Sequence, residues 1–109
     1  MANFVRLFRA LGDATRQQML SLLERAGEMC VSDLARNFEM TQPSVSHHLR
    51  ILRDADLVTA HKRGKEVYYA VNPEELTTCC GAFFEKFACC RSLLKGAGRK
   101  SRAAVKGTS

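Results

Sequence analysis

The sequence predicts a single, mainly helical domain that carries one β-hairpin. Apolar residues recur at helical spacing over most of the chain, whereas residues 57–71 hold two β-rich runs around a glycine turn. A length of 109 residues, of which 46% are hydrophobic and 26% charged, is typical of one compact unit and excludes a two-domain enzyme. No apolar run approaches the roughly 20 residues of a bilayer span, so we expect a cytoplasmic protein with no membrane partner.

Three short helices are predicted in the first part of the chain. Residues 3–11 place apolar side chains at helical spacing, and Gly12-Asp13 then breaks this helix and can cap the next one. The second helix covers residues 14–25, with apolar residues on one face and charged residues on the other. A third helix follows from Val31 to an interruption at residues 37–40, with Ser32 or Asp33 as its capping residue.

A fourth helix begins with the strongest local signals in the chain. Thr41 supplies a hydroxyl cap and Pro43 lies in the first turn, where a proline is tolerated. The side chains of Val45, Leu49 and Leu52 share the buried face. The opposite face presents Gln42, Ser44, His47 and Arg50.

The last part of the chain is predicted to form a hairpin and a final helix. Residues 57–71 form two strands, joined by the glycine-containing turn at residues 62–65. Asn72-Pro73 then starts a helix that is expected to continue to about Leu94. The predicted order is therefore four helices, two strands and a fifth helix, without an internal repeat.

The positive charge is concentrated at the C-terminus. The formal net charge is +6, but residues 95–109 hold five basic residues and no acidic one. Residues 1–94 then carry 12 basic against 11 acidic residues, so overall basicity is weak evidence for nucleic-acid binding. We expect one DNA-binding and dimerisation domain over residues 1–94, followed by a solvated, disordered tail that can add nonspecific phosphate contacts.

The arrangement of the helices is better evidence for DNA binding. Two short helices joined by a tight turn form a helix-turn-helix, whose second helix enters the major groove. Gln can bond adenine edges, Ser can bond bases or phosphates, and the arginines Arg50 and Arg53 can neutralise phosphates. The basic turn with Lys62, Arg63 and Lys65 would lie beside the groove as a wing.

Three stretches resemble the ArsR/SmtB family of winged-helix metal-responsive repressors. They are Leu11-Gly12-Asp13-Ala14-Thr15-Arg16, Cys30-Val31-Ser32-Asp33-Leu34-Ala35 and Gln42-Pro43-Ser44-Val45-Ser46-His47-His48-Leu49-Arg50-Ile51-Leu52. The resemblance covers residues 3–94 and implies a winged helix-turn-helix homodimer, assembled through the first and last helices. It also implies binding to double-stranded operator DNA and release when an inducer binds. By this resemblance Gln42, Ser44, Ser46 and His47 lie at the groove, although Pro43 stands where many members carry Ser.

Histidines are not expected to bind the inducer. In a recognition helix that carries the pair His47 and His48, one typically contacts DNA and the other packs. Members with a zinc site on the last helix use Asp and His ligands, whereas residues 74–94 here contain no histidine.

The five cysteines are expected to be free thiols, because the cytoplasm is reducing. Many arsenic-responsive members carry a Cys-Val-Cys-Asp-Leu-Cys pattern in the third helix. Only Cys30 of that pattern is present here, so we expect it to be a core residue. The other four form two adjacent pairs, Cys79-Cys80 and Cys89-Cys90, in the final helix.

The spacing of these pairs predicts a site shared between two chains. Cys79 and Cys90 are eleven positions apart, which at about 100° per residue returns to within roughly 20° of the same direction. Both are then expected to face the dimer seam with the apolar stripe. They lie about 16 Å apart along one helix, so one chain cannot use both for the same ion. In an antiparallel pair of helices, Cys79 of one chain lies opposite Cys89 and Cys90 of the other.

A site of three thiols suits a trivalent metalloid, As(III) or Sb(III), because soft sulfur ligands select soft ions. We take Cys79, Cys89 and Cys90 as the ligands, with Cys80 as a spare thiol or a fourth ligand. The sequence thus predicts a metalloid-responsive repressor, with the metalloid as inducer and no organic cofactor. A fourth thiol would instead favour Zn(II), Cd(II) or Pb(II), and the clustered pairs also resemble the antimonite-responsive branch of the family.

Two other classes of function would make different demands on the cysteines. A redox or persulfide sensor on the same fold would oxidise its thiols between subunits, because adjacent cysteines in a helix are badly placed to bridge one another. A thiol-dependent enzyme would need a Cys-x-x-Cys at a helix start and a substrate pocket. The sequence has neither feature, so we expect no enzymatic activity.

Overall fold

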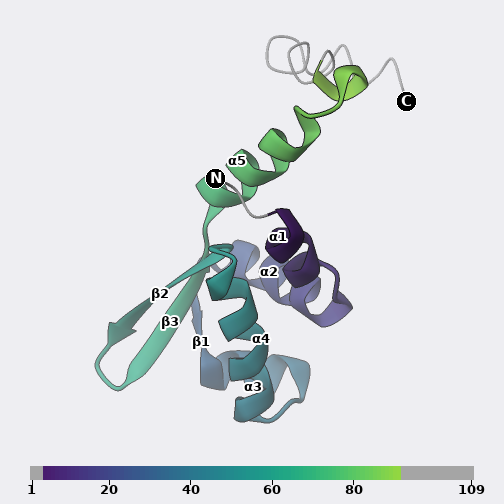
Figure 1. The fold of residues 1–109 in the computed structure, drawn as a ribbon. Coiled ribbons are helices and arrows are strands. Elements are labelled where there is room, and N and C mark those ends of the chain that lie inside the picture. The colour runs from purple at the N-terminus through teal and green to yellow at the C-terminus, as the bar shows by residue number, and fades with distance from the viewer. Residues whose placement is uncertain (1–3, 92–109) are drawn as a thin grey trace.

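A computed structural model describes residues 4–91 as five helices and three strands (Figure 1). The elements are α1 (Phe4–Leu11), α2 (Ala14–Ala26), β1 (Met29–Cys30), α3 (Val31–Phe38), α4 (Gln42–Asp54), β2 (Val58–Arg63), β3 (Glu66–Val71) and α5 (Pro73–Phe84). The mainly helical class and the order of the predicted elements are confirmed. The predicted domain boundary at residue 94 and the basic tail of residues 95–109 lie outside the described residues.

Three helices begin at the capping residues that the sequence indicates. In each, a side-chain oxygen accepts a hydrogen bond from the backbone amide three residues later: Asp13 from Arg16 (3.0 Å), Thr41 from Ser44 (3.3 Å) and Asn72 from Glu75 (3.4 Å). These bonds satisfy amides that the first turn of a helix leaves without a partner. The bond from Arg16 is also the main reason why the pKa of the Asp13 carboxyl is lowered.

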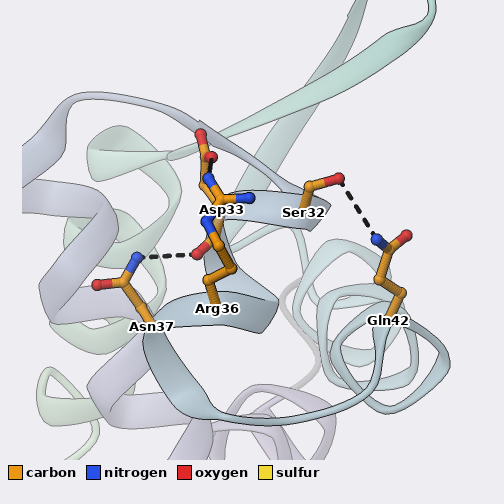
Figure 2. Close-up of polar contacts among 5 residues, drawn as sticks. All are labelled: Ser32, Asp33, Arg36, Asn37 and Gln42. Atoms are coloured by element: carbon orange, nitrogen blue, oxygen red, sulfur yellow. Dashed lines mark hydrogen bonds and ion pairs between the residues drawn. The ribbon is translucent and has the colours of Figure 1, made fainter.

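The start of α3 differs from the prediction. The residue before the helix is Cys30, which makes no side-chain capping bond, so the assignment of Ser32 or Asp33 as the cap is wrong. Asp33 lies inside the first turn instead, where its carboxylate pairs with Arg36 and its carbonyl accepts a bond from Asn37 (Figure 2). An acidic side chain in the first turn interacts favourably with the helix dipole and so stabilises the helix.

The sheet has three strands rather than the two predicted. The hairpin β2–β3 is present, and β1 pairs antiparallel with β3, giving the order β1-β3-β2. In this register Met29 is opposite Tyr69 and Cys30 is opposite Tyr68. The hairpin projects away from the helices as a wing beside α4 (Figure 1).

The core lies between the first four helices and the start of the hairpin. Its largest fully buried side chains are Leu7, Met19, Leu23, Leu34, Val45, Leu49, Leu52 and Leu57. Three of these belong to α4, which is therefore held by its apolar face with the other face turned outward. Within the described residues, no helix combines the length and the apolar character needed to cross a bilayer.

The final helix is shorter than predicted. α5 ends at Phe84, a turn occupies residues 85–87, and residues 88–91 are helical again. The expectation of one continuous helix to Leu94 is therefore wrong between residues 85 and 87, and the last three residues of that helix lie outside the described part. The rotation that related Cys79 to Cys90 assumed a continuous helix, so it does not apply.

Candidate nucleic-acid interface and thiol site

The outer face of α4 carries the polar residues that the sequence assigned to it. Gln42, Ser44, His47 and Arg50 are exposed, and Ser46 is half-buried. Val45 and Leu49, on the other face, are fully buried. Burial of one face fixes the helix while leaving the other face open to a ligand such as DNA.

Gln42 lies at the first turn of α4 and faces α3. Its amide donates to the hydroxyl of Ser32 over 3.5 Å (Figure 2). This is at the long limit for a hydrogen bond, so the contact is weak and the amide is easily drawn to a base edge.

The two adjacent histidines have different surroundings. His47 is exposed, whereas His48 is half-buried and its Nδ1 lies 3.1 Å from the Nη1 of Arg16. Burial lowers the pKa of His48, and Arg16 lowers it further against the opposing effect of Asp13. The neutral imidazole accepts a hydrogen bond from Arg16, which confirms that one histidine of the pair packs.

Arg16 is a positioning residue that the sequence reasoning missed. Its guanidinium also donates to the carbonyl oxygens of Ala10 (2.8 Å) and Arg9 (3.2 Å) at the end of α1. One side chain of α2 thus connects α1 to the back of α4 through His48. It occupies the last position of the Leu11–Arg16 motif, which is the signal that could have identified it.

A hollow of about 430 Å³ lies beside the outer face of α4. Its lining combines α4 residues with one residue of β3: Ser46, Arg50, Arg53, Asp54 and Tyr69. Within residues 4–91, the guanidinium groups of Arg50 and Arg53 have no hydrogen-bond or ion-pair partner. Two unpaired guanidinium groups beside hydroxyls can bind a phosphate.

The three basic residues of the wing are not equivalent. Lys62 and Lys65 are exposed without a polar partner in the described part of the chain. Arg63, by contrast, lies 2.7 Å from a carboxylate oxygen of Glu28. Glu28 follows α2 and precedes β1, and no sequence motif indicated that it would contact the wing.

The four C-terminal thiols fall into two different environments. Cys79 is only 6% exposed, packs in the protomer core and donates a 2.8 Å hydrogen bond to the carboxylate of Glu75. This bond, together with burial, raises the pKa of Cys79 to about 11. The neighbouring Cys80 is half-buried against the same core.

The second pair is more accessible. Cys89 is exposed and Cys90 half-buried, and their sulfur atoms lie 3.9 Å apart. Partial burial, together with the Cys89 thiol, raises the pKa of Cys90. Two thiols at this distance can both reach one soft ion.

The structure does not bring Cys79 to Cys89 and Cys90 within one chain. No group of three or more His, Cys, Asp or Glu residues between positions 4 and 91 is placed to hold a metal ion. That Cys79 faces a dimer seam stays a prediction, and within its own protomer its side chain is buried in the core. Cys30 is buried too, as expected for a core residue.

An apolar surface adjoins the thiols. Phe83 of α5 packs edge-on against Phe4 and Phe8 of α1, with ring centroids 5.4 and 4.7 Å apart. Beside this cluster, the apolar side chains exposed to solvent are Val5 (65%), Phe8 (37%), Phe84 (41%) and Phe87 (46%). Large exposed apolar groups on neighbouring elements mark an interaction surface.

Comparison with known proteins shows relatives among bacterial regulators. An arsenical resistance operon repressor of Bacillus subtilis is 38% identical over 98 residues, which cover 90% of each chain. The transcriptional repressor SdpR of the same species is 41% identical over 66 residues, 61% of this chain and 72% of SdpR. A homologue of the cadmium resistance regulatory protein CadC from Staphylococcus aureus is 38% identical over 74 residues, 68% of this chain and 61% of that protein.

A similar architecture occurs in a solved structure. The homodimeric winged helix-turn-helix DNA-binding domain of a Mycobacterium bovis regulator matches with a TM-score of 0.64 and 28% identity, over 72% of this chain and 73% of that one. The family model described as bacterial regulatory protein, arsR family, matches residues 13–60, which contain the helix-turn-helix. By its sequence, its relatives and its fold, this chain belongs to the ArsR family of DNA-binding transcriptional regulators.

Proposed function

We propose that this ArsR-family repressor binds operator DNA as a homodimer and is released when As(III) or Sb(III) binds thiols near the end of α5. The observation that carries the proposal is the pair of exposed Cys89 and half-buried Cys90, whose sulfur atoms lie 3.9 Å apart. A relative that covers 90% of the chain is named an arsenical resistance operon repressor. The third helix has only one cysteine of the arsenic-binding pattern, so the Cys89–Cys90 pair provides the ligands for such an inducer instead.

DNA is bound by α4 in the major groove and by the wing beside it. The exposed residues Gln42, Ser44 and His47 and the half-buried Ser46 meet base edges, while Arg50 binds a phosphate. Arg53 and Tyr69 share the hollow with Arg50 and Ser46, which supports a phosphate at that place. Lys62, Arg63 and Lys65 add contacts from the wing.

The homodimer forms through α1 and the region of α5. The exposed side chains of Val5, Phe8, Phe84 and Phe87 would then be covered by a second copy of the chain. A domain of this size stabilises itself only modestly, so burying such a surface between copies is favourable.

The third sulfur ligand comes from Cys79 of the partner subunit, because Cys89 and Cys90 supply only two. Cys79 is held by Glu75 at 2.8 Å, so its ligation requires that this hydrogen bond breaks and that the thiol leaves the core. Binding of the metalloid is thereby coupled to a change in how α5 packs. This change in packing moves the two α4 helices of the dimer, so that they no longer match the major grooves. A coupling of a few kcal/mol is enough for release.

The test is fluorescence anisotropy of the reduced protein on the DNA upstream of its own gene. A phosphine reductant is used, because thiol reductants compete for the metalloid. As(III), Sb(III), Zn(II), Cd(II) and Pb(II) are titrated separately, and release by the trivalent ions alone is expected. Tight binding that none of the ions reverses would contradict the proposal.

Cysteine variants locate the site. Cys89→Ser/Cys90→Ser is expected to bind the DNA normally and to lose the response to As(III) and Sb(III). Cys80→Ser is the matched control, since it removes one thiol from the same region and is expected to respond like the unmodified protein. Normal induction of the double variant would place the site elsewhere.

The same anisotropy experiment distinguishes two alternative functions of the thiols. Release by divalent ions, together with loss of response in Cys80→Ser, would indicate a soft-metal sensor with four thiols, a function that the cadmium-related homologue favours. Release by peroxide or polysulfide, but by no ion, would indicate a redox sensor, for which the exposed Cys89 is suited.

A further inference from the structure

Arg63 is part of the wing, yet its guanidinium group is bound to the body of the domain. Nη2 lies 2.7 Å from Oε2 of Glu28 and 2.8 Å from Nε2 of His61. The other carboxylate oxygen of Glu28 is 3.4 Å from the same His61 nitrogen. The guanidinium also lies over the ring of Tyr68, 4.5 Å from its centroid.

This arrangement crosses the sheet. Tyr68 of the central strand β3 is opposite Cys30 in β1 and His61 in β2. β1 and β2 lie on opposite sides of β3. Glu28 comes just before β1, whereas Arg63 belongs to β2. The guanidinium is thus bound across the sheet face to the body of the domain, whereas the neighbouring Lys62 and Lys65 remain exposed.

We propose that Glu28 is a specificity-determining residue, which competes with DNA for Arg63. Nonspecific duplex is then bound by α4 and the two lysines, with Arg63 still on Glu28. Where the minor groove beside the wing is narrow, its negative potential is stronger. At such a sequence Arg63 leaves Glu28 and binds the DNA. The inference rests on the proposed contact of the wing with DNA but not on the metalloid response.

The strength of the Glu28 contact suits such a competition. The side chains of Glu28, His61 and Arg63 are 34%, 50% and 55% exposed, so the ion pair is screened by solvent and is weak. A stronger, buried pair would keep Arg63 from every DNA sequence. An absent pair would leave Arg63 free to bind any phosphate, as the lysines do.

The test compares two duplexes of equal length and base composition, one carrying the upstream DNA and one with its sequence shuffled. Anisotropy is measured without metalloid at several salt concentrations. For Glu28→Gln we expect about threefold tighter binding to the shuffled duplex and a smaller gain on the upstream DNA. The salt slope on the shuffled duplex should steepen by about 0.9, the value for one additional phosphate contact.

Two further variants separate competition from a simple change of charge. Glu66→Gln removes one negative charge from the same wing, where Glu66 is exposed opposite Arg63 in the hairpin register. It should leave the ratio of the two affinities unchanged. In Arg63→Gln, binding to the upstream DNA should weaken selectively, and adding Glu28→Gln to this variant should change neither affinity.

The outcomes distinguish this inference from the proposed function. Equal effects of Glu28→Gln and Glu66→Gln, or an undiminished effect of Glu28→Gln in the Arg63→Gln background, would overturn the competition. Unmodified protein that does not prefer its upstream DNA would instead contradict the proposed operator binding. Loss of induction in a thiol variant bears on neither of these measurements.

Discussion

Replacing Arg16 by Met tests whether one side chain connects α1 to the recognition helix. Met keeps most of the aliphatic stem but removes three hydrogen bonds, to Ala10, Arg9 and His48. The bonds to Ala10 and His48 are partly buried and contribute about 1.5 kcal/mol each, and the exposed one to Arg9 contributes about 0.5 kcal/mol. The free energy of unfolding should therefore fall by about 3.5 kcal/mol.

Urea denaturation at one fixed protein concentration measures this loss. With a slope of about 2 kcal/mol/M, the midpoint should fall by about 1.7 M. Arg25→Met is the matched control, because Arg25 belongs to the same helix and its side chain has no polar partner within residues 4–91. Its unfolding free energy should change by less than about 0.5 kcal/mol.

A second readout isolates the contact with α4. Burial and the Arg16 guanidinium both lower the pKa of His48, whereas Asp13 raises it. Without the guanidinium the pKa of His48 should rise, as followed by an NMR titration of the imidazole. Equal urea midpoints for Arg16→Met and Arg25→Met, with an unchanged titration of His48, would refute the reasoning.

Three further predictions concern stability. Thr41→Ala removes the cap of α4 and should lower the free energy of unfolding by about 1 kcal/mol, which corresponds to a fall in the melting temperature of about 4–8 °C. The control Thr59→Ala, on the exposed side of β2, should change the melting temperature little. Gly27 has φ +92°, a conformation that L side chains rarely adopt, so Gly27→Ala should cost about 1 kcal/mol in the same measurement. The Cys79 pKa of about 11 lies above the ordinary value of 9.0, so the folded state is favoured below pH 9 and loses this advantage as pH rises to 11. Urea midpoints should therefore fall over this range in the unmodified protein and stay flatter in Cys79→Ala.

Local signals predicted the elements that position the DNA-binding surface. Thr41, Pro43 and the apolar residues Val45 and Leu49 determine where α4 begins and which face it buries, and all of these lie within a few positions of one another. The hairpin was equally local, since the turn around Gly64 joins strands that pair with each other. Such elements can be predicted because their stabilising contacts are close in sequence.

Other features depend on residues that are distant in sequence. β1 has two residues, and only its pairing with Tyr68 and Tyr69 makes it a strand. The contact of Glu28 with Arg63 requires the same pairing. These features follow from tertiary packing, which one sequence does not reveal.

The sequence identified the candidate thiols but could not predict their geometry. A continuous period of 3.6 residues placed Cys79 and Cys90 on one side of one helix. Residues 85–87 contain no proline or glycine that would indicate a break, yet α5 ends before them. The burial of Cys79 likewise depends on how α5 lies on the core.

The hydrogen bond from Cys79 to Glu75 has a consequence for calorimetry. A thiol with a pKa of about 11 carries its proton at neutral pH, and the raised pKa of Cys90 favours the protonated form there as well. Three protonated thiols that bind As(OH)₃ yield three molecules of water, so no proton passes to the buffer. Three thiols that bind Cd(II) must release three protons. The heat of binding should therefore be independent of the buffer's ionisation enthalpy for As(III) and should vary with it for Cd(II).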